Sequence, residues 1–358
     1  NLKMTIIPPL TVPDILQPLI QAWVTWFTTT FISLPIATFI MWWDVPRCIY
    51  GFLFRERPRV ILITGVDTNI GEKFALEYAK HGNTLGLLSS DKYKLNRLVD
   101  ECNKRGAEAL SLHCDISNLE LLRDTVEEFI NERPIDLLIA NTSQIDTIQD
   151  GATRWEDMFE QVIVTNINGI IGVIMSTYKR MQDRGKGQIA IVNPTAGHFS
   201  IPQMIYHNMT KSALLAFSRD FRYLARKHNI NVSIISPGLI DIPITTKALL
   251  PISNFQFLFA SANSLVSISK MQLQMGNFEI VWPFLETLPA YACQTLPPRI
   301  LNIITYFVGL ICEFFARINE APRLELQEKL VNADAGETTC ETSETNYNNQ
   351  SETQFETM

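Results

Sequence analysis

Residues 59–71 read RVILITGVDTNIG, and this stretch decides the fold class. An apolar run is followed by a turn of small and polar residues, and the amphipathic pattern of residues 72–80 predicts a helix. A strand, a tight turn and a helix in this order open a dinucleotide-binding fold, in which backbone N–H groups hold a pyrophosphate. The candidate residues for that contact are Thr64, Gly65, Asn69, Ile70 and Gly71.

Outward from this stretch, further apolar runs rich in Val, Ile and Leu alternate with segments of helical pattern. They are LGLLSS at 85–90, DLLIAN at 136–141, IAIVN at 189–193 and VSIIS at 232–236. Continuous apolar strands belong to a parallel sheet that helices cover on both faces. The sequence therefore predicts an α/β fold of Rossmann type, a doubly wound parallel sheet. The 46% hydrophobic content is ample for its core.

The order of the motifs resembles the short-chain dehydrogenase/reductase family. Thr64, Gly65 and Gly71 match the TGxxxGxG turn, with Asn69 in place of the middle glycine. Asparagine tolerates positive φ better than other side chains, so we expect the turn to survive there. The downstream landmarks follow in family order: Asp115, Asn141, Asn166, Lys211 and the pair Pro237 and Gly238.

The resemblance also assigns catalytic positions. In the family, a tyrosine exchanges a proton with the substrate oxygen, a lysine four residues later lowers the pKa of that tyrosine and holds the ribose, a serine polarises the carbonyl, and an asparagine steadies a water relay. Lys211 matches the lysine and Asn166 the asparagine. The usual spacing, however, places His207 at the tyrosine and Pro194 at the serine.

A hydroxyl stands next to each altered position, because Tyr206 precedes His207 and Thr195 follows Pro194. Three hypotheses stay open at this point. In the first, Tyr206 and Thr195 both shift into place, Tyr206 through a local irregularity of its helix. Alternatively, His207 is the general acid, since an imidazole with a reference pKa of ~6.5 suits proton transfer near neutrality. In the third, ordinary catalysis is lost.

The residues after the second strand bear on cofactor choice. In the family, an acidic residue there binds the adenosine 2′-hydroxyl of NAD, whereas an arginine favours the 2′-phosphate of NADP. This chain has Ser89 and Ser90 at those positions, with Lys92 and Lys94 close behind. Small hydroxyls and lysines can bind a phosphate group, so NADP is slightly preferred over NAD. Two further departures are Ile242, where the family often has a nicotinamide-contacting threonine, and residues 140–143, ANTS in place of NNAG.

Charge and cysteine content narrow the function class. The net charge of −7 argues against nucleic-acid binding. Much of it comes from residues 326–358, a segment rich in Thr, Asn, Ser and Glu that we expect to be a disordered acidic tail. The six cysteines form no CxxC pair, which favours reduced thiols and no metal site.

Residues 15–43 are 29 consecutive uncharged residues, more than the ~20 that a membrane-spanning helix needs. A single span is the preferred reading over a re-entrant hairpin or a signal peptide. Arginines at 47, 55, 57 and 59 follow it, against one lysine before it, so the positive-inside rule places the main domain in the cytosol. The endoplasmic reticulum is the expected membrane.

The expected domain organisation has four parts. They are an anchor and juxtamembrane segment at 1–56, an NAD(P)-binding dehydrogenase domain at 57–250, a substrate lid or membrane-associated region at 251–325, and the tail at 326–358. The resemblance implies an oxidoreductase acting on a hydroxyl or carbonyl of a hydrophobic, lipid-like substrate, and it leaves a homodimer open. The alternative is a catalytically impaired, membrane-tethered pseudo-dehydrogenase that binds nucleotide or a protein partner.

Overall fold

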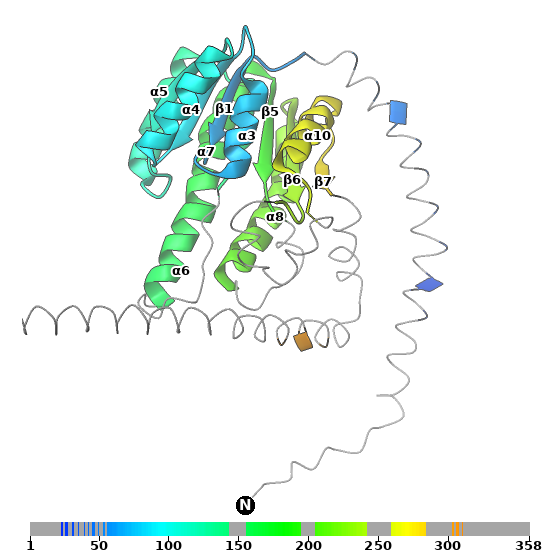
Figure 1. Ribbon diagram of the computed structural model, residues 1–358. Coiled ribbons are helices and arrows are strands. Elements are labelled where there is room, and N and C mark those ends of the chain that lie inside the picture. Colours follow the sequence, from blue (N-terminus) through cyan, green and yellow to red (C-terminus); the bar gives the residue numbers. More distant parts are fainter. Residues whose placement is uncertain are drawn as a thin grey trace, which may run out of the picture. The chain divides into compact units, whose positions relative to one another are not determined.

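The computed structural model describes residues 56–142, 155–194, 205–241 and 259–283, with isolated positions between 23 and 53 and between 303 and 310. Within these ranges, strands and helices alternate along the chain (Figure 1). Their bounds are β1 Val60–Thr64, α3 Asn69–Tyr78, β2 Thr84–Ser89, α4 Lys92–Lys104, β3 Glu108–His113, α5 Leu119–Glu132, β4 Leu137–Ala140, α6 Trp155–Ile163, the π-helix η2 Val164–Gly169, α7 Ile170–Arg184, β5 Gly187–Val192, α8 Ile205–Arg226, β6 Ile230–Pro237, α10 Ala262–Met275 and β7 Glu279–Trp282.

The strands form one parallel sheet in the order β3-β2-β1-β4-β5-β6-β7. The order reverses between β1 and β4, because the chain builds outward from β1 in one direction and then from β4 in the other. In open α/β sheets, a ligand binds at the carboxyl ends of the strands on either side of such a reversal. The predicted doubly wound fold is therefore confirmed, and its ligand edge lies beyond Thr64 and Ala140.

Helices cover both faces of the sheet, each over its own apolar core. On one face, side chains of α3, α4 and α10 pack with alternate strand residues such as Ile61 and Ile63. On the other face, α5, α7 and α8 pack with the intervening residues, such as Leu62 and Leu138. Because successive strand side chains point to opposite faces, strands buried on both sides must be apolar at every position. The burial of β1 and β4 explains the uninterrupted apolar runs.

Short polar residues begin the helices at the carboxyl edge of the sheet. The Asp91 side chain accepts a hydrogen bond from the Lys94 N–H at the start of α4, and Asn118 does the same for Leu121 at α5. Each cap satisfies one N–H group that has no partner within the helix. At the opposite edge, Gly185 ends α7 with φ 66°, a left-handed conformation that favours glycine.

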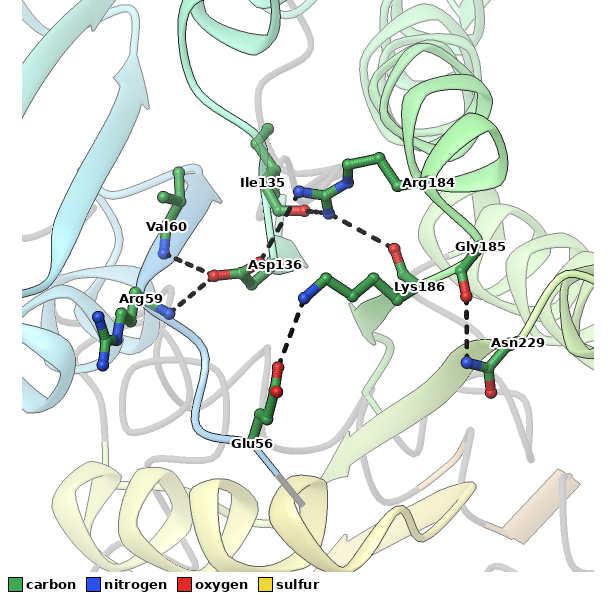
Figure 2. Close-up of polar contacts among 9 residues, drawn as sticks. All are labelled: Glu56, Arg59, Val60, Ile135, Asp136, Arg184, Gly185, Lys186 and Asn229. Carbon is green, nitrogen blue, oxygen red and sulfur yellow. Dashed lines mark hydrogen bonds and ion pairs between the residues drawn. The ribbon is translucent and has the colours of Figure 1, made fainter.

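A polar network around Asp136 holds the other edge of the sheet together (Figure 2). One carboxylate oxygen of Asp136 accepts hydrogen bonds from the backbone N–H groups of Arg59 (3.0 Å) and Val60 (3.2 Å). Arg184 lies 3.8 Å from its other oxygen and donates to the Ile135 carbonyl, and Lys186 pairs with Glu56 at 3.4 Å. These contacts fix the amino ends of β1, β4 and β5, on the side away from the ligand edge.

The sheet continues beyond the expected domain boundary at residue 250. Strand β7 pairs with β6, and α10 packs against α3. Both elements lie in the range expected to form a lid or membrane-associated region, so the dehydrogenase fold extends at least to Trp282. The apolar pattern of the part of this range that forms α10 reflects packing on the sheet, since Leu265, Val266 and Leu273 are buried in the core.

The expected membrane anchor lies mostly outside the described residues. The few described positions between 23 and 53 are helical with exposed apolar side chains, for example Trp23 and Trp42. Within the described part of the chain, one continuous helix, Met158–Arg184, is long and apolar enough to span a membrane. It contains α7, whose side chains Val173, Ile174 and Met181 are buried in the core.

Candidate active site

The turn after β1 is tied directly to the end of β4. The Thr64 hydroxyl donates to the Asn141 carbonyl at 2.8 Å, and the Asn141 N–H donates back to that hydroxyl at 2.9 Å. The Asn141 carboxamide N–H₂ donates to the Gly65 carbonyl and to the Thr68 hydroxyl, each at 3.0 Å. Thr64 and Asn141 are both buried. The pair closes the gap between the two strands and fixes the start of the turn.

Two glycines allow the close approach of backbone in this turn. Gly65 has φ +62°, and a Cβ on Gly71 would lie 2.2 Å from the Gly65 carbonyl oxygen. Thr68 caps α3 by accepting a hydrogen bond from the Gly71 N–H at 3.0 Å. The first N–H groups of α3, those of Asn69 and Ile70, have no acceptor within the helix. They are therefore placed to bind an anion at the positive end of the helix dipole.

The expectation for Asn69 needs a correction. Asn69 is the first residue of α3, and among the described non-glycine residues only Asn229 has a positive φ. The substitution of the family's glycine therefore imposes no backbone strain. What Asn69 changes is the space beside the helix start, because its side chain is exposed there.

The end of β2 and the end of β3 form the neighbouring part of this edge. Ser89 is buried, and its hydroxyl accepts a hydrogen bond from the Asp91 N–H at 3.0 Å. Ser90 is exposed, and its carbonyl lies 3.1 Å from the His113 ring nitrogen Nε2. Asp115 is also exposed, with one carboxylate oxygen accepting from the Ser117 N–H at 2.8 Å. Polar groups held by backbone contacts therefore line this part of the edge.

His207 and Lys211 lie on the inner face of α8. Their side chains are 4% and 0% exposed, as expected for two residues one turn apart on the buried face of one helix. Tyr206 is only half-buried, and its ring makes an edge-to-face contact with Phe159 of α6, with ring centroids 5.5 Å apart. Helix α8 is α-helical from Ile205 onward. The irregularity that would bring Tyr206 onto the face of Lys211 is absent from this described helix.

Asn166 joins this face through a chain of hydrogen bonds. It lies in η2, a π-helical turn between α6 and α7, and is fully buried. The Thr142 hydroxyl donates to its carboxamide oxygen at 2.5 Å, and its N–H₂ group lies 3.5 Å from the Thr210 hydroxyl, which donates to the His207 carbonyl at 2.8 Å. The end of β4, η2 and α8 are thereby connected. Single π-helical turns inside α-helices often occur at functional sites.

The Lys211 amine is the most unusual group of the site. Its nitrogen is buried and has no hydrogen-bond partner in the described part of the chain. Burial disfavours the charged form and lowers the pKa of Lys211 to about 8. An ammonium in this position needs an acceptor, and the hydroxyls of a ribose supply one. Together with the Gly65–Gly71 approach, this unpartnered group fits a dinucleotide whose pyrophosphate lies on α3 and whose nicotinamide half reaches α8.

The described residues thus bring most of the expected site residues to one edge of the sheet. Pro237 is buried at the end of β6, and the Gly238 N–H donates to the Trp282 carbonyl at 3.0 Å, which fixes that motif against β7. Pro194 follows β5 and offers no hydroxyl. Thr195 and Ile242 lie outside the described residues, so the place of the second hydroxyl of the shift hypothesis is not described.

Sequence reasoning did not single out Thr142, Thr210 or Asn193. The sequence shows ANTS in place of the family's NNAG. It does not show that the hydroxyl of this threonine, Thr142, bonds Asn166 in η2, which is distant in the sequence. Asn193 is 0% exposed at the end of β5. The signal available in the sequence was an asparagine that stands between an apolar strand and a proline.

Comparison with known proteins agrees with this geometry. The sequence profile of the family described as short chain dehydrogenase matches residues 59–250. A dehydrogenase/reductase SDR family protein 7-like of Drosophila melanogaster is 26% identical over 238 residues, which cover 63% of this chain and 70% of the relative. An 11-beta-hydroxysteroid dehydrogenase 1A of Arabidopsis thaliana is 27% identical over 208 residues, 56% of this chain and 58% of that protein.

Solved structures share the fold. A short-chain dehydrogenase from Sphingobium yanoikuyae in complex with NADPH aligns with a TM-score of 0.55 at 22% identity, covering 63% of this chain and 88% of that one. NAD+-bound xylitol dehydrogenase aligns with a TM-score of 0.56 at 22% identity, covering 63% and 97%. The family profile spans more than half of the 358 residues. The chain therefore belongs to the short-chain dehydrogenase/reductase family.

Proposed function

We propose that the chain is an NAD(P)-dependent oxidoreductase that interconverts a hydroxyl and a carbonyl on a hydrophobic, lipid-like substrate. The observation that carries the proposal is the buried Lys211 amine, which has no partner among the described residues and lies one turn from the buried His207. A buried, unpaired ammonium is destabilising unless a ligand supplies an acceptor. The nicotinamide, when bound, supplies or takes the hydride.

His207 is the group that we propose for proton transfer to and from the substrate oxygen. It occupies the position one turn before Lys211 and shares its buried face. Tyr206 instead packs its ring on Phe159.

Lys211 itself has two proposed tasks. Its amine binds the ribose hydroxyls of the cofactor, and its burial holds the charge close to the place where a proton is exchanged. Asn166 supports the site indirectly, because the Thr210 hydroxyl beside its carboxamide N–H₂ group also donates to the His207 carbonyl, while Thr142 donates to the Asn166 carboxamide oxygen. Pro194 contributes no hydroxyl to polarise the carbonyl, so we expect turnover to be slow for this family.

Exposed apolar side chains near the site support a hydrophobic substrate. Phe159 of α6 is 43% exposed, and Ile205 and Met209 at the start of α8 are 50% and 39% exposed. Both helices extend past the carboxyl ends of the strands (Figure 1). Apolar groups gathered beside a polar catalytic face match a substrate with one oxygen function on an apolar body. Steroids, retinoids and long-chain keto-lipids are the classes to test.

NADP is the proposed cofactor, with NAD as the alternative. Neither of the two positions at the end of β2 is acidic, because they are Ser89 and Ser90. The next carboxylate along the chain, that of Asp91, accepts a hydrogen bond from the Lys94 N–H at 3.0 Å and lies 3.4 Å from the Lys94 ammonium. This engagement partly neutralises the charge that would repel a 2′-phosphate. Titration of the purified chain with NADPH and NADH, followed by cofactor fluorescence, would separate the two cofactors.

Membrane attachment through residues 15–43, with the dehydrogenase domain cytosolic at the endoplasmic reticulum, also remains our proposal. It is supported by the uncharged run and the arginines that follow it, and by the exposed aromatic rings at described helical positions such as Trp23, Trp26 and Trp42. Protease protection on sealed microsomes tests it. Complete protection of the dehydrogenase domain would reverse the proposed orientation.

The function is tested by combining cofactor titration with turnover. The full chain in detergent or vesicles is titrated with NADPH, and consumption of NADPH is then measured with ketones of the three substrate classes. We expect saturable binding and slow turnover of at least one lipid-like ketone. Binding without turnover of any of them would establish the nucleotide-binding pseudo-dehydrogenase instead. Absence of both would overturn the cofactor site as well.

A further inference from the structure

A second polar group lies beneath α8, at the carboxyl ends of β5 and β6. Val192 pairs with Ile235, and the Asn193 N–H donates to the Ile235 carbonyl at 2.8 Å, so Asn193 stands beside Ser236 on the next strand. Both side chains are 0% exposed. Ile191 on β5 and Val232 on β6 belong to the core that includes α8. Because strand side chains alternate, Asn193 and Ser236 face the same way, towards α8.

Lys211 stands at the same level along the sheet. Helix α8 runs antiparallel to the strands, because the turn after Arg226 leads directly into β6 at Ile230. From Ile230 to Ser236 the strand rises roughly 20 Å at ~3.3 Å per residue. From Ala225 back to Lys211 the helix rises roughly 21 Å at ~1.5 Å per residue. Helix α8 packs on β6. The two matching rises therefore put Lys211 at about the height of Asn193 and Ser236.

The polar atoms of these three side chains lack partners. Both the oxygen and the nitrogen of the Asn193 carboxamide, the Ser236 hydroxyl and the Lys211 amine are buried without a hydrogen bond among the described residues. Each such atom is destabilising when it stays unpaired. The matching rises bring these four atoms to one level of the sheet, and with both donors and acceptors represented they suit a small polar molecule. Water is the smallest molecule that both donates and accepts hydrogen bonds, so it can serve all of these atoms.

The carboxamide of Asn166, unlike that of Asn193, already has hydrogen-bond partners in the protein. Its oxygen accepts from Thr142, and its nitrogen lies at hydrogen-bond distance from Thr210. We propose that Asn193 and Ser236 bind buried water against the Lys211 amine, and that Asn193 is a positioning residue that sets the protonation of this lysine. The water accepts a hydrogen bond from the ammonium and donates one to the Asn193 oxygen, while Ser236 completes its coordination.

The proposal rests on the proposed function only for the importance of Lys211, and its test does not require activity. Few other titratable groups lie close enough to affect the pKa of Lys211. On α8 the described titratable side chains within two turns of Lys211 are Tyr206 and His207, whereas Arg219, Asp220, Arg222, Tyr223 and Arg226 lie farther along the helix. Helix α6 contributes the exposed Glu160, and η2, β5 and β6 carry none.

The experiment measures the pKa of Lys211 directly. The full chain is labelled with 13C at the lysine ε-carbon and titrated without cofactor, and the Lys211 signal is assigned as the one missing in Lys211→Arg. We expect Asn193→Asp to raise the pKa of Lys211, because a carboxylate now faces the water next to the ammonium. Asn193→Leu and Ser236→Ala should lower it, because the water loses its partners.

Two substitutions serve as matched controls. Ser269→Ala on α10 and Thr177→Val on α7 each remove a buried hydroxyl that also lacks a partner among the described residues, but away from Lys211. They should leave the titration of Lys211 unchanged. If Asn193→Asp does not fold, as judged by circular dichroism, the milder Ser236→Ala and Asn193→Ser decide.

A titration of Lys211 that is the same in parent, Asn193 and Ser236 variants overturns the proposal, whether or not the chain turns over a ketone. Shifts of opposite sign for Asn193→Asp and Asn193→Leu support it, because a general loss of packing would move both in the same direction. NADPH consumption by the parent chain is recorded separately and tests the proposed function alone.

Discussion

His207 and Lys211 lie one helical turn apart on the buried face of α8, while Tyr206 turns its ring to Phe159 on α6. The relationship identifies which of two adjacent side chains accompanies the lysine. The general-acid role therefore falls to the imidazole in our proposal, and the neighbouring phenol serves packing.

This arrangement gives a first prediction on catalysis. His207→Gln should reduce ketone turnover by roughly a hundredfold or more, the usual contribution of general acid–base catalysis. Tyr206→Phe keeps the ring contact with Phe159 and should have a mild effect. The reverse order of the two variants would assign the proton transfer to Tyr206.

A second prediction concerns stability and pH. Burial lowers the pKa of Lys211 from 10.5 to about 8, so between these values the unfolded chain binds more protons than the folded chain. The free energy of unfolding should therefore rise with pH from about 8 to about 10.5 through this group. Below pH 8 the full penalty applies, on the order of 3 kcal/mol.

Lys211→Met removes this penalty and keeps most of the packing volume. We expect it to unfold at higher urea concentration than the parent at pH 7, and to show a flatter pH dependence between 8 and 10.5. It should also lose NADPH affinity. Equal stability of the two proteins at pH 7 would mean that the amine is well solvated in solution.

A third prediction tests the turn after β1. A Cβ at Gly71 would lie 2.2 Å from the Gly65 carbonyl, so Gly71→Ala must push α3 away from the turn. We expect a loss of roughly 1–3 kcal/mol, as for other overpacked sites, and loss of NADPH binding. Gly172→Ala is the control, because its nearest neighbour atom is 4.0 Å away and alanine favours a helix. Normal NADPH affinity in Gly71→Ala would place the pyrophosphate elsewhere.

A fourth prediction addresses the chain from Thr142 to His207. Thr142→Val leaves the buried Asn166 oxygen without this donor, which should destabilise the fold by roughly 1–3 kcal/mol. Thr142→Ser keeps the hydroxyl and should be close to the parent in both stability and turnover. Thr177→Val, which removes a buried hydroxyl that has no partner among the described residues, should be neutral or slightly stabilising. Similar losses for the two valine variants would argue against the hydrogen bond.

The sequence by itself determined the doubly wound sheet and the ligand edge. Continuous apolar strands such as residues 60–64 and 137–140 require helices on both faces of the sheet. Gly65 and Gly71 mark the tight turn that leads from the first of these strands into α3. These features depend on the pattern of residues that are close together in the sequence and on the backbone geometry that those residues allow. The positions of Asn141, Lys211 and Pro237 at one edge followed from the strand and helix ends near them.

Only the tertiary structure decided which side chains come together in the site. Whether Tyr206 or His207 accompanies Lys211 depended on the rotation of α8 over the sheet and on the ring of Phe159, which comes from a distant helix. The same applies to Thr142, whose hydroxyl meets Asn166, and to Asn193, which lies beside Ser236. Strand β7 was also missed, because four residues at the sheet edge carry too weak a pattern. Burial and hydrogen bonding across such sequence distances are set by packing, since no local pattern encodes which side chains a folded chain brings together.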